Sequence, residues 1–187
     1  MIRAGVILLV GASSVSADST LPAFLQAVGG EYALTDQSGE TRTQADPNNT
    51  AQLLFFGYAN CLQICSSVLP QMAIIADALA EDDRALVPMM ITVDPVFDTV
   101  DAIGPALTQY HPDFVGLTGS DMELQVAYDA FQIEKEILFE DPEYGPVYAH
   151  GSFLYLMDGA REVLTIIPPI LSDDEIINII SKYIPVG

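Results

Sequence analysis

Apolar runs separated by helical patterns dominate the first two thirds of the chain. The stretches 52–58 and 86–94 are almost continuously apolar, and a shorter run covers 114–117. Such runs predict strands buried on both faces of a sheet. Apolar residues at helical spacing follow the first two runs, as far as Glu81 and Leu107, and predict helices there.

The last third of the chain continues the series with less regularity. A capping pattern predicts a helix over 120–131, and a strand is expected near 133–139. The segments 152–157 and 162–167 are predicted to form a hairpin, and a helix capped by Ser172 closes the chain. This alternation predicts one three-layer α/β domain with largely parallel strands and an antiparallel hairpin at its end.

Turn signals add a hairpin at the start and a break in one helix. The segments 31–36 and 39–44 flank a Gln37-Ser38-Gly39 turn and predict two antiparallel strands. Gly104-Pro105 is expected to interrupt the helix that ends near Leu107.

Composition and charge narrow the class of protein. The chain has 187 residues, half of them hydrophobic, which suffices for one substantial core. Six basic residues against 26 acidic ones give a formal net charge of −20. Phosphate groups of nucleic acids and anionic lipids would be repelled, so neither is an expected partner.

The amino terminus predicts export. Residues 1–17 combine Arg3, a short apolar run and small residues before Asp18, as a cleavable signal peptide does. The apolar run is shorter than the roughly 18–20 residues that cross a bilayer, and the alternative is a retained short anchor. We expect a lead-in segment over 18–30, a domain over 31–187, and a periplasmic protein with no stable membrane insertion after cleavage.

The only two cysteines, Cys61 and Cys65, follow the first buried strand. If a helix begins near Cys61, residues four positions apart lie on one face, so both sulfurs can reach one metal ion or each other. A helix amino terminus also favours the reactive thiolate. A structural disulfide or two inert core thiols are the alternatives.

Two thiolates make an incomplete metal site, because Cu(I) takes two or three soft donors and zinc usually takes four ligands. The chain offers two imidazoles, His111 and His150. His111 lies in a turn and is interpreted as a hydrogen-bonded turn residue. His150 precedes a buried strand, in a loop that a thioredoxin-like sheet would place beside the cysteines, so we favour it as the third ligand.

Four motifs resemble the SCO/SenC family of copper proteins over roughly residues 28–184. They are Phe55-Phe56-Gly57-Tyr58 with Cys61 and Cys65, Thr92-Val93-Asp94-Pro95 with Asp98-Thr99, Tyr110-His111-Pro112-Asp113-Phe114 with Gly116-Leu117-Thr118-Gly119, and His150 with Tyr155-Leu156-Met157-Asp158. The resemblance implies a thioredoxin-like α/β/α fold and a Cu(I)/Cu(II) site with Cys61, Cys65 and His150 as ligands.

The same resemblance implies an exported copper metallochaperone rather than an enzyme. Family members deliver copper to the CuA site of cytochrome c oxidase subunit II, or reduce its cysteines. The partner is therefore subunit II or another copper-accepting protein, with a thiol reductant as a further candidate. Leu62, Ser66 and Ala149 depart from the family, which usually has proline after each cysteine and aspartate before the histidine.

Other function classes stay open on the residues alone. A periplasmic thiol-disulfide oxidoreductase would use Cys61 as nucleophile and Cys65 as resolving thiol. Two features argue against that class. Three residues separate the cysteines, where thioredoxins have two, and the segment 149–152 has no proline. A copper or redox sensor is a third candidate, and a peroxidase is the weakest.

Overall fold

The structure is a computed structural model that describes residues 27–61 and 65–187, without the side chain of Cys65. The predicted signal peptide, 1–17, and most of the lead-in segment lie outside the described residues. Within the described part, no helix has the length and apolar character needed to cross a membrane.

The described strands form a central sheet of seven, in the order β2-β1-β5-β4-β3-β8-β9. Their bounds are β1 (Ala33–Asp36), β2 (Thr41–Thr43), β3 (Ala51–Gly57), β4 (Leu86–Thr92), β5 (Val115–Thr118), β8 (Leu154–Met157) and β9 (Val163–Ile167). The central strands β5, β4 and β3 are parallel, whereas β1, β2, β8 and β9 pair antiparallel. The sheet thus has a parallel centre and antiparallel margins, including the predicted first and last hairpins.

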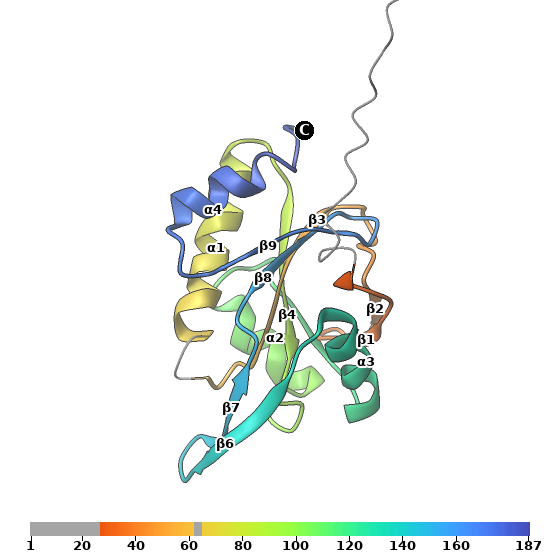
Figure 1. Cartoon of the computed structure of the whole chain (residues 1–187), viewed down its shortest axis with the longest axis vertical. Coiled ribbons are helices and arrows are strands. Elements are labelled where there is room, and N and C mark those ends of the chain that lie inside the picture. The colour runs from red at the N-terminus through yellow and green to blue at the C-terminus, as the bar shows by residue number, and fades with distance from the viewer. Residues whose placement is uncertain (1–26, 62–64) are drawn as a thin grey trace, which may run out of the picture.

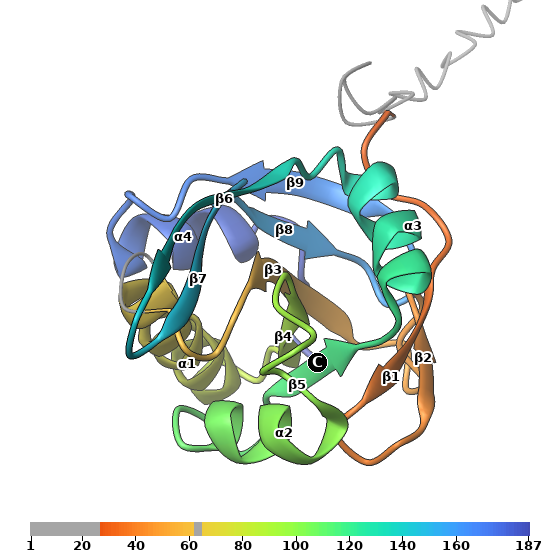
Figure 2. The same cartoon turned by 90° about the horizontal axis from the view of Figure 1, so that it is seen from below.

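Helices cover both faces of this sheet (Figures 1 and 2). They are α1 (Cys65–Glu81), α2 (Val100–Thr108), α3 (Asp121–Phe131) and α4 (Asp173–Ile180). Helix α1 packs on β4 and α4, α2 packs on β5, and α3 lies against β1. Figure 2 shows α1 and α4 on one face and α3 on the other. The predicted thioredoxin-like three-layer α/β fold is confirmed.

The core forms where the sequence is continuously apolar. Six of the seven residues of β3 and six of the seven of β4 are buried, as expected for strands covered on both faces. Phe56 lies at the centre of an aromatic cluster with Tyr128, Phe131 and Tyr155, at centroid distances of 5.3–6.1 Å. Burial of these rings contributes to the stability of the fold.

The helix ends follow the predicted caps. Ser120 and Ser172 each accept a hydrogen bond from the backbone N–H three residues on, and the glutamate there bonds back to the cap. The predicted break in α2 is wrong, because the helix runs through Gly104 and Pro105 as far as Thr108.

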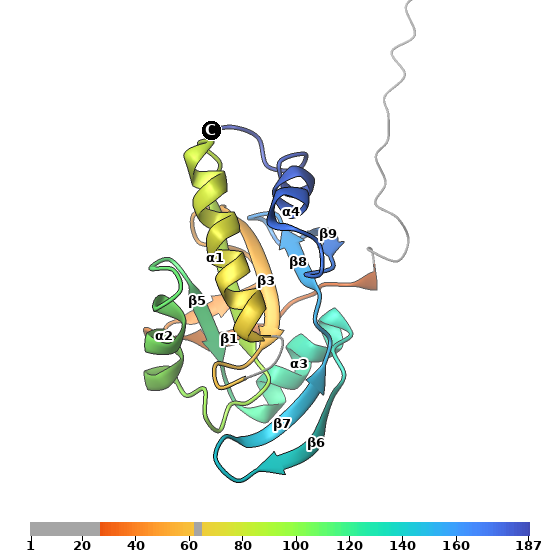
Figure 3. The ribbon, with the colours of Figure 1, turned by 90° about the vertical axis from the view of Figure 1, so that its left-hand side faces the viewer.

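A second, two-stranded sheet departs from the sequence prediction. Strand β6 (Lys135–Asp141) pairs antiparallel with β7 (Gly145–His150). The sequence predicted one strand in this region and placed His150 in a loop, whereas His150 is the last residue of β7. Gly145 has a φ of 81°, a conformation that favours glycine at the turn. The β6–β7 hairpin projects beyond the central sheet at the end where β3 leads toward α1 (Figure 3).

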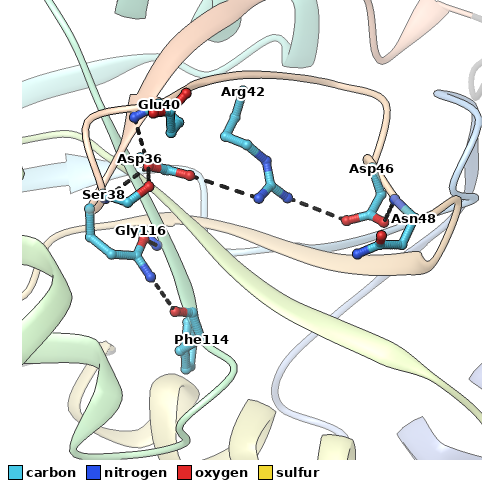
Figure 4. A network of polar contacts seen from close by, with 9 residues as sticks. Asp36, Ser38, Glu40, Arg42, Asp46, Asn48, Phe114 and Gly116 are labelled. Carbon is cyan, nitrogen blue, oxygen red and sulfur yellow. Dashed lines mark hydrogen bonds and ion pairs between the residues drawn. The ribbon is translucent and has the colours of Figure 1, made fainter.

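The corner formed by β1 and β2 is held by polar contacts around Arg42 (Figure 4). Arg42 Nη2 lies 3.3 Å from Asp46 Oδ2, and Arg42 Nη1 lies 3.8 Å from Asp36 Oδ2. Each carboxylate also accepts two backbone N–H bonds from the turn that follows it, at 2.8 and 3.1 Å. These buried carboxylates are therefore fully matched by donors.

Candidate metal centre

Cys61 and Cys65 lie at the carboxyl end of β3, but they do not share a helix face. Cys61 is buried, 6% exposed, in the turn that follows the strand, and α1 begins at Cys65. Cys61 is not part of α1, so the condition that both cysteines lie on one helix is not met and helical spacing does not bring the sulfurs together. Residues 62–64 between the cysteines, and the side chain of Cys65, lie outside the described residues.

The turn before Cys61 is fixed to the neighbouring elements. The Val93 N–H donates to Gly57 O at 2.8 Å, and the Cys61 N–H donates to Tyr58 O at 3.3 Å. The Ala59 N–H donates to the Asp98 carboxylate, with N–O distances of 3.1 and 3.3 Å. The position of Cys61 is thus set by bonds to β4 and to the segment before α2.

His150 reaches this turn through Tyr58. The His150 ring packs edge-on to Tyr58 and Phe55, with centroids 6.1 and 6.0 Å apart. His150 Nδ1 lies 2.9 Å from Gly151 O, so a proton on Nδ1 would be held there and Nε2 would remain for a metal ion. Tyr58 therefore contacts the imidazole with its ring and the Cys61 backbone with its carbonyl.

His111 occupies a different place and makes different contacts. His111 Nε2 lies 3.2 Å from the Asp77 carboxylate on α1, and His111 Nδ1 accepts the Asp113 N–H at 3.1 Å. Both ring nitrogens are engaged, which confirms the interpretation of His111 as a hydrogen-bonded turn residue.

The described atoms do not show the three predicted ligands as one site. Among the described side chains, which exclude that of Cys65, no three His, Cys, Asp or Glu groups lie close enough to hold a metal ion. The assignment of Cys61, Cys65 and His150 as one site stays a prediction. A thiol–imidazole set suits a soft or borderline ion such as copper.

A buried carboxylate, Asp98, supports the cysteine turn, and Asp94 lies near it. Burial raises the pKa of Asp98 to about 6, opposed by hydrogen bonds from Thr92 and Ala59, and the charge of Asp94 raises it further. The Thr92 hydroxyl donates to Asp98 at 2.6 Å. No functional role was assigned to Asp98 from the sequence, and its place in a motif of the resemblance was the available signal.

Lys135 and Tyr148 continue this polar cluster toward the hairpin. The Lys135 ammonium donates to Val93 O at 3.0 Å and lies 5.6 Å from the Tyr148 ring centroid. The Tyr148 hydroxyl lies 3.5 Å from Asp94, whose pKa is raised chiefly by burial. Lys135 is the cross-strand partner of His150, so the cluster and the imidazole share the base of the hairpin.

Comparison with known proteins decides the family. The SCO1/SenC family model matches residues 22–185. The chain belongs to the SCO1/SenC family. A SCO2-like protein of Rickettsia conorii is 33% identical over 140 residues, which span 73% of this chain and 67% of that relative. The match thus spans about two thirds of the relative's length.

Solved structures agree with the family assignment. Copper-bound ScoI of Arabidopsis thaliana is 26% identical, with a TM-score of 0.78 over 83% of this SCO1/SenC chain and 97% of that chain. BsSco, described as having a disulfide switch and as a member of the Sco family of cytochrome c oxidase assembly proteins, is 20% identical with a TM-score of 0.62, over 82% of this chain and 92% of that one. At that identity BsSco supports the fold alone.

Proposed function

We propose that this SCO1/SenC protein is a periplasmic copper chaperone. Cys61, Cys65 and His150 bind one copper ion, and the acceptor is cytochrome c oxidase subunit II or another copper-accepting protein. The observation that carries the proposal is the joint contact of Tyr58 with the His150 ring and the Cys61 backbone, in a family with copper-bound members. Two separate segments of the chain thereby meet at one point.

Ligand exchange is the chemistry that fits these donors. Thiols of the acceptor lose their protons and bind the copper ion as thiolates, while the thiolates of Cys61 and Cys65 release the ion and take up protons. The oxidation state of copper does not change in this exchange. A site with few ligands lets the incoming sulfur bind before the outgoing one leaves.

The two histidines provide a matched test. His150→Ala removes the proposed imidazole ligand, and His111→Ala removes an imidazole held by Asp77 and Asp113 instead. We expect the Cu(II) affinity of His150→Ala to fall by about tenfold or more, with a changed sulfur-to-copper charge-transfer band, and that of His111→Ala to change by about twofold or less. Equal affinities for both variants would refute the ligand assignment.

A thiol-disulfide oxidoreductase is the second candidate, and one observation favours it. Cys65 is the first described residue of α1, near the helix amino terminus where a thiolate is stabilised, whereas Cys61 lies before the helix and is buried. The nucleophile of this alternative is therefore Cys65, with the buried Cys61 as resolving thiol. Insulin reduction by the metal-free protein, abolished in Cys65→Ser, would support this activity, and no turnover would exclude it.

A further inference from the structure

The outer strand of the β6–β7 hairpin carries an apolar patch beside the proposed copper site. Ile137, Leu138 and Phe139 are 52%, 55% and 52% exposed. They form the longest consecutive run of exposed large apolar side chains in the described residues. Such a run lowers solubility unless something covers it, so it points to an interaction surface. We call these three residues the hairpin patch.

A bulge lies within the patch. The β6–β7 register shifts between Ile137 and Phe139, so Leu138 has no cross-strand partner. A bulge of this kind re-aims the side chain it contains and occurs frequently next to functional sites. It also discourages another strand from pairing along β6, so side chains rather than backbone groups would make the contact.

The patch lies next to the turn that holds Cys61. A cavity of about 150 Å³ separates Phe139 from Tyr58 and Asn60. Asn60 Nδ2 donates to Tyr144 O at 3.1 Å, and Phe97 packs over Gly145. These contacts fix the hairpin to the body of the protein, so a molecule bound to the patch would be held close to Cys61.

Acidic residues flank the patch in the sequence and outnumber the basic ones. Residues 134–143 contain a single basic side chain, Lys135, and its ammonium points to Val93 O and the Tyr128 and Tyr148 rings. The acidic side chains of the segment are Glu134, Glu136, Glu140, Asp141 and Glu143. An apolar centre with an acidic rim fits an apolar side chain ringed by lysine or arginine.

We propose that the hairpin patch is the docking surface for a protein partner that presents apolar side chains within a basic rim. The role of this contact in copper transfer rests on the proposed function, but the contact itself does not require copper. A second copy of this chain is a poor occupant, because each copy carries a formal charge of −20. Anionic lipid is disfavoured for the same reason.

The first test measures binding of dye-labelled peptides to the metal-free protein by fluorescence anisotropy at low salt. The probe is Lys-Lys-Leu-Leu-Lys-Lys, and the control probe is Glu-Glu-Leu-Leu-Glu-Glu. We expect the lysine peptide to bind and the glutamate peptide not to bind. Leu138→Ser should weaken the affinity for the lysine peptide about fivefold. Ile74→Ser, at a side chain 51% exposed on α1, is the matched control and should change the affinity by less than about twofold.

A second pair of variants tests the acidic rim. Each double variant removes two negative charges. Glu136→Gln/Glu140→Gln removes them from the hairpin, and Asp82→Asn/Asp83→Asn removes them from the end of α1. We expect the hairpin pair to weaken the lysine peptide about threefold or more, and the α1 pair to have no comparable effect. Three results would overturn the proposal. Both charge pairs could weaken peptide binding equally, or Leu138→Ser could bind the peptide as tightly as wild type does. The third is a dimer, seen by light scattering, that Leu138→Ser abolishes.

Copper titration separates this proposal from the proposed function. Leu138→Ser is expected to bind copper as wild type does, because Leu138 is not among the proposed ligands. A wild-type protein that binds the lysine peptide but no copper would refute the chaperone and leave the docking surface standing. A protein that binds copper but no lysine peptide would refute the docking surface and leave the chaperone standing.

Discussion

Two corners of the molecule treat buried carboxylates in opposite ways. At the β1–β2 corner, burial would raise the pKa of Asp36, but hydrogen bonds from Ser38 and Glu40 and the charge of Arg42 outweigh it and lower the pKa. At the cysteine turn, burial dominates and raises the pKa of Asp98 to about 6. No Arg or Lys forms an ion pair with Asp98 among the described side chains.

The opposite pKa shifts suggest different roles: the carboxylates of the β1–β2 corner stabilise the fold, and Asp98 serves the proposed metal site. The β1–β2 corner matches each carboxylate with donors, as expected where a turn only has to be stable. The cysteine turn holds Asp98 with fewer donors, close to a proposed metal site, and strongly perturbed carboxylates cluster at functional sites. Substitutions at the first corner should therefore affect stability alone, and substitutions at the second should also affect copper.

The largest expected effect is at the β1–β2 corner. Asp46→Ala removes the nearer of two carboxylate partners of the half-buried Arg42 and the acceptor of two backbone N–H groups. We expect the free energy of unfolding to fall by about 1–3 kcal/mol, because two backbone donors are left unmatched and Arg42 keeps only its longer contact with Asp36. Chemical denaturation measures the change. A copper affinity reduced beyond what partial unfolding explains would break the distinction between the two corners.

The next effect concerns Tyr58 at the cysteine turn. Tyr58→Leu keeps the backbone carbonyl that accepts from Cys61 but removes the ring that packs on His150. We expect the copper affinity to fall by about tenfold, because the imidazole loses the neighbour that orients it. Competition with a copper chelator measures the affinity. Tyr144→Leu, at the hairpin turn, is the control and should retain the wild-type affinity.

The smallest effect is the pH dependence contributed by Asp98. Its folded pKa of about 6 lies above the unfolded value of about 4, so its stabilising contribution is present at low pH and is lost as pH rises through 6. Between pH 7.5 and 5, the stability of wild type relative to Asp98→Asn should therefore rise by about 1 kcal/mol.

Asp36→Asn is the control for this titration. The pKa of Asp36 is lowered, so its contribution is present above the unfolded value of about 4 and is lost as pH falls through the folded one. The difference in unfolding free energy between wild type and Asp36→Asn should thus stay the same between pH 7.5 and 5. A parallel pH dependence of both variants, measured by denaturation at each pH, would contradict the contrast.

The sequence predicted the elements whose signals are local. The apolar runs of β3 and β4 and the serine caps of α3 and α4 depend on neighbours in the chain, and all are confirmed. Strand β7 was missed because Gly145-Pro146 reads as a turn and the residues after it show no clear alternation of burial.

The arrangement of the site depended on contacts distant in sequence. Asp98 binds the Ala59 N–H 39 positions away, and no local pattern encodes that bond. The cysteine spacing allowed both residues to lie on one helix face, but Cys61 lies in the turn that includes Ala59 and Asn60 and is not part of α1. His150 was identified as the histidine near the cysteine turn, but its position at a strand end required the fold.

The central claim is that Cys61 and Cys65 hold copper, and metal content tests it most directly. Wild type and Cys61→Ser/Cys65→Ser are loaded with copper under identical conditions, freed of excess metal and analysed for copper per chain. The account predicts about one bound copper ion in wild type and almost none in the double variant. Equal copper in both proteins would contradict it.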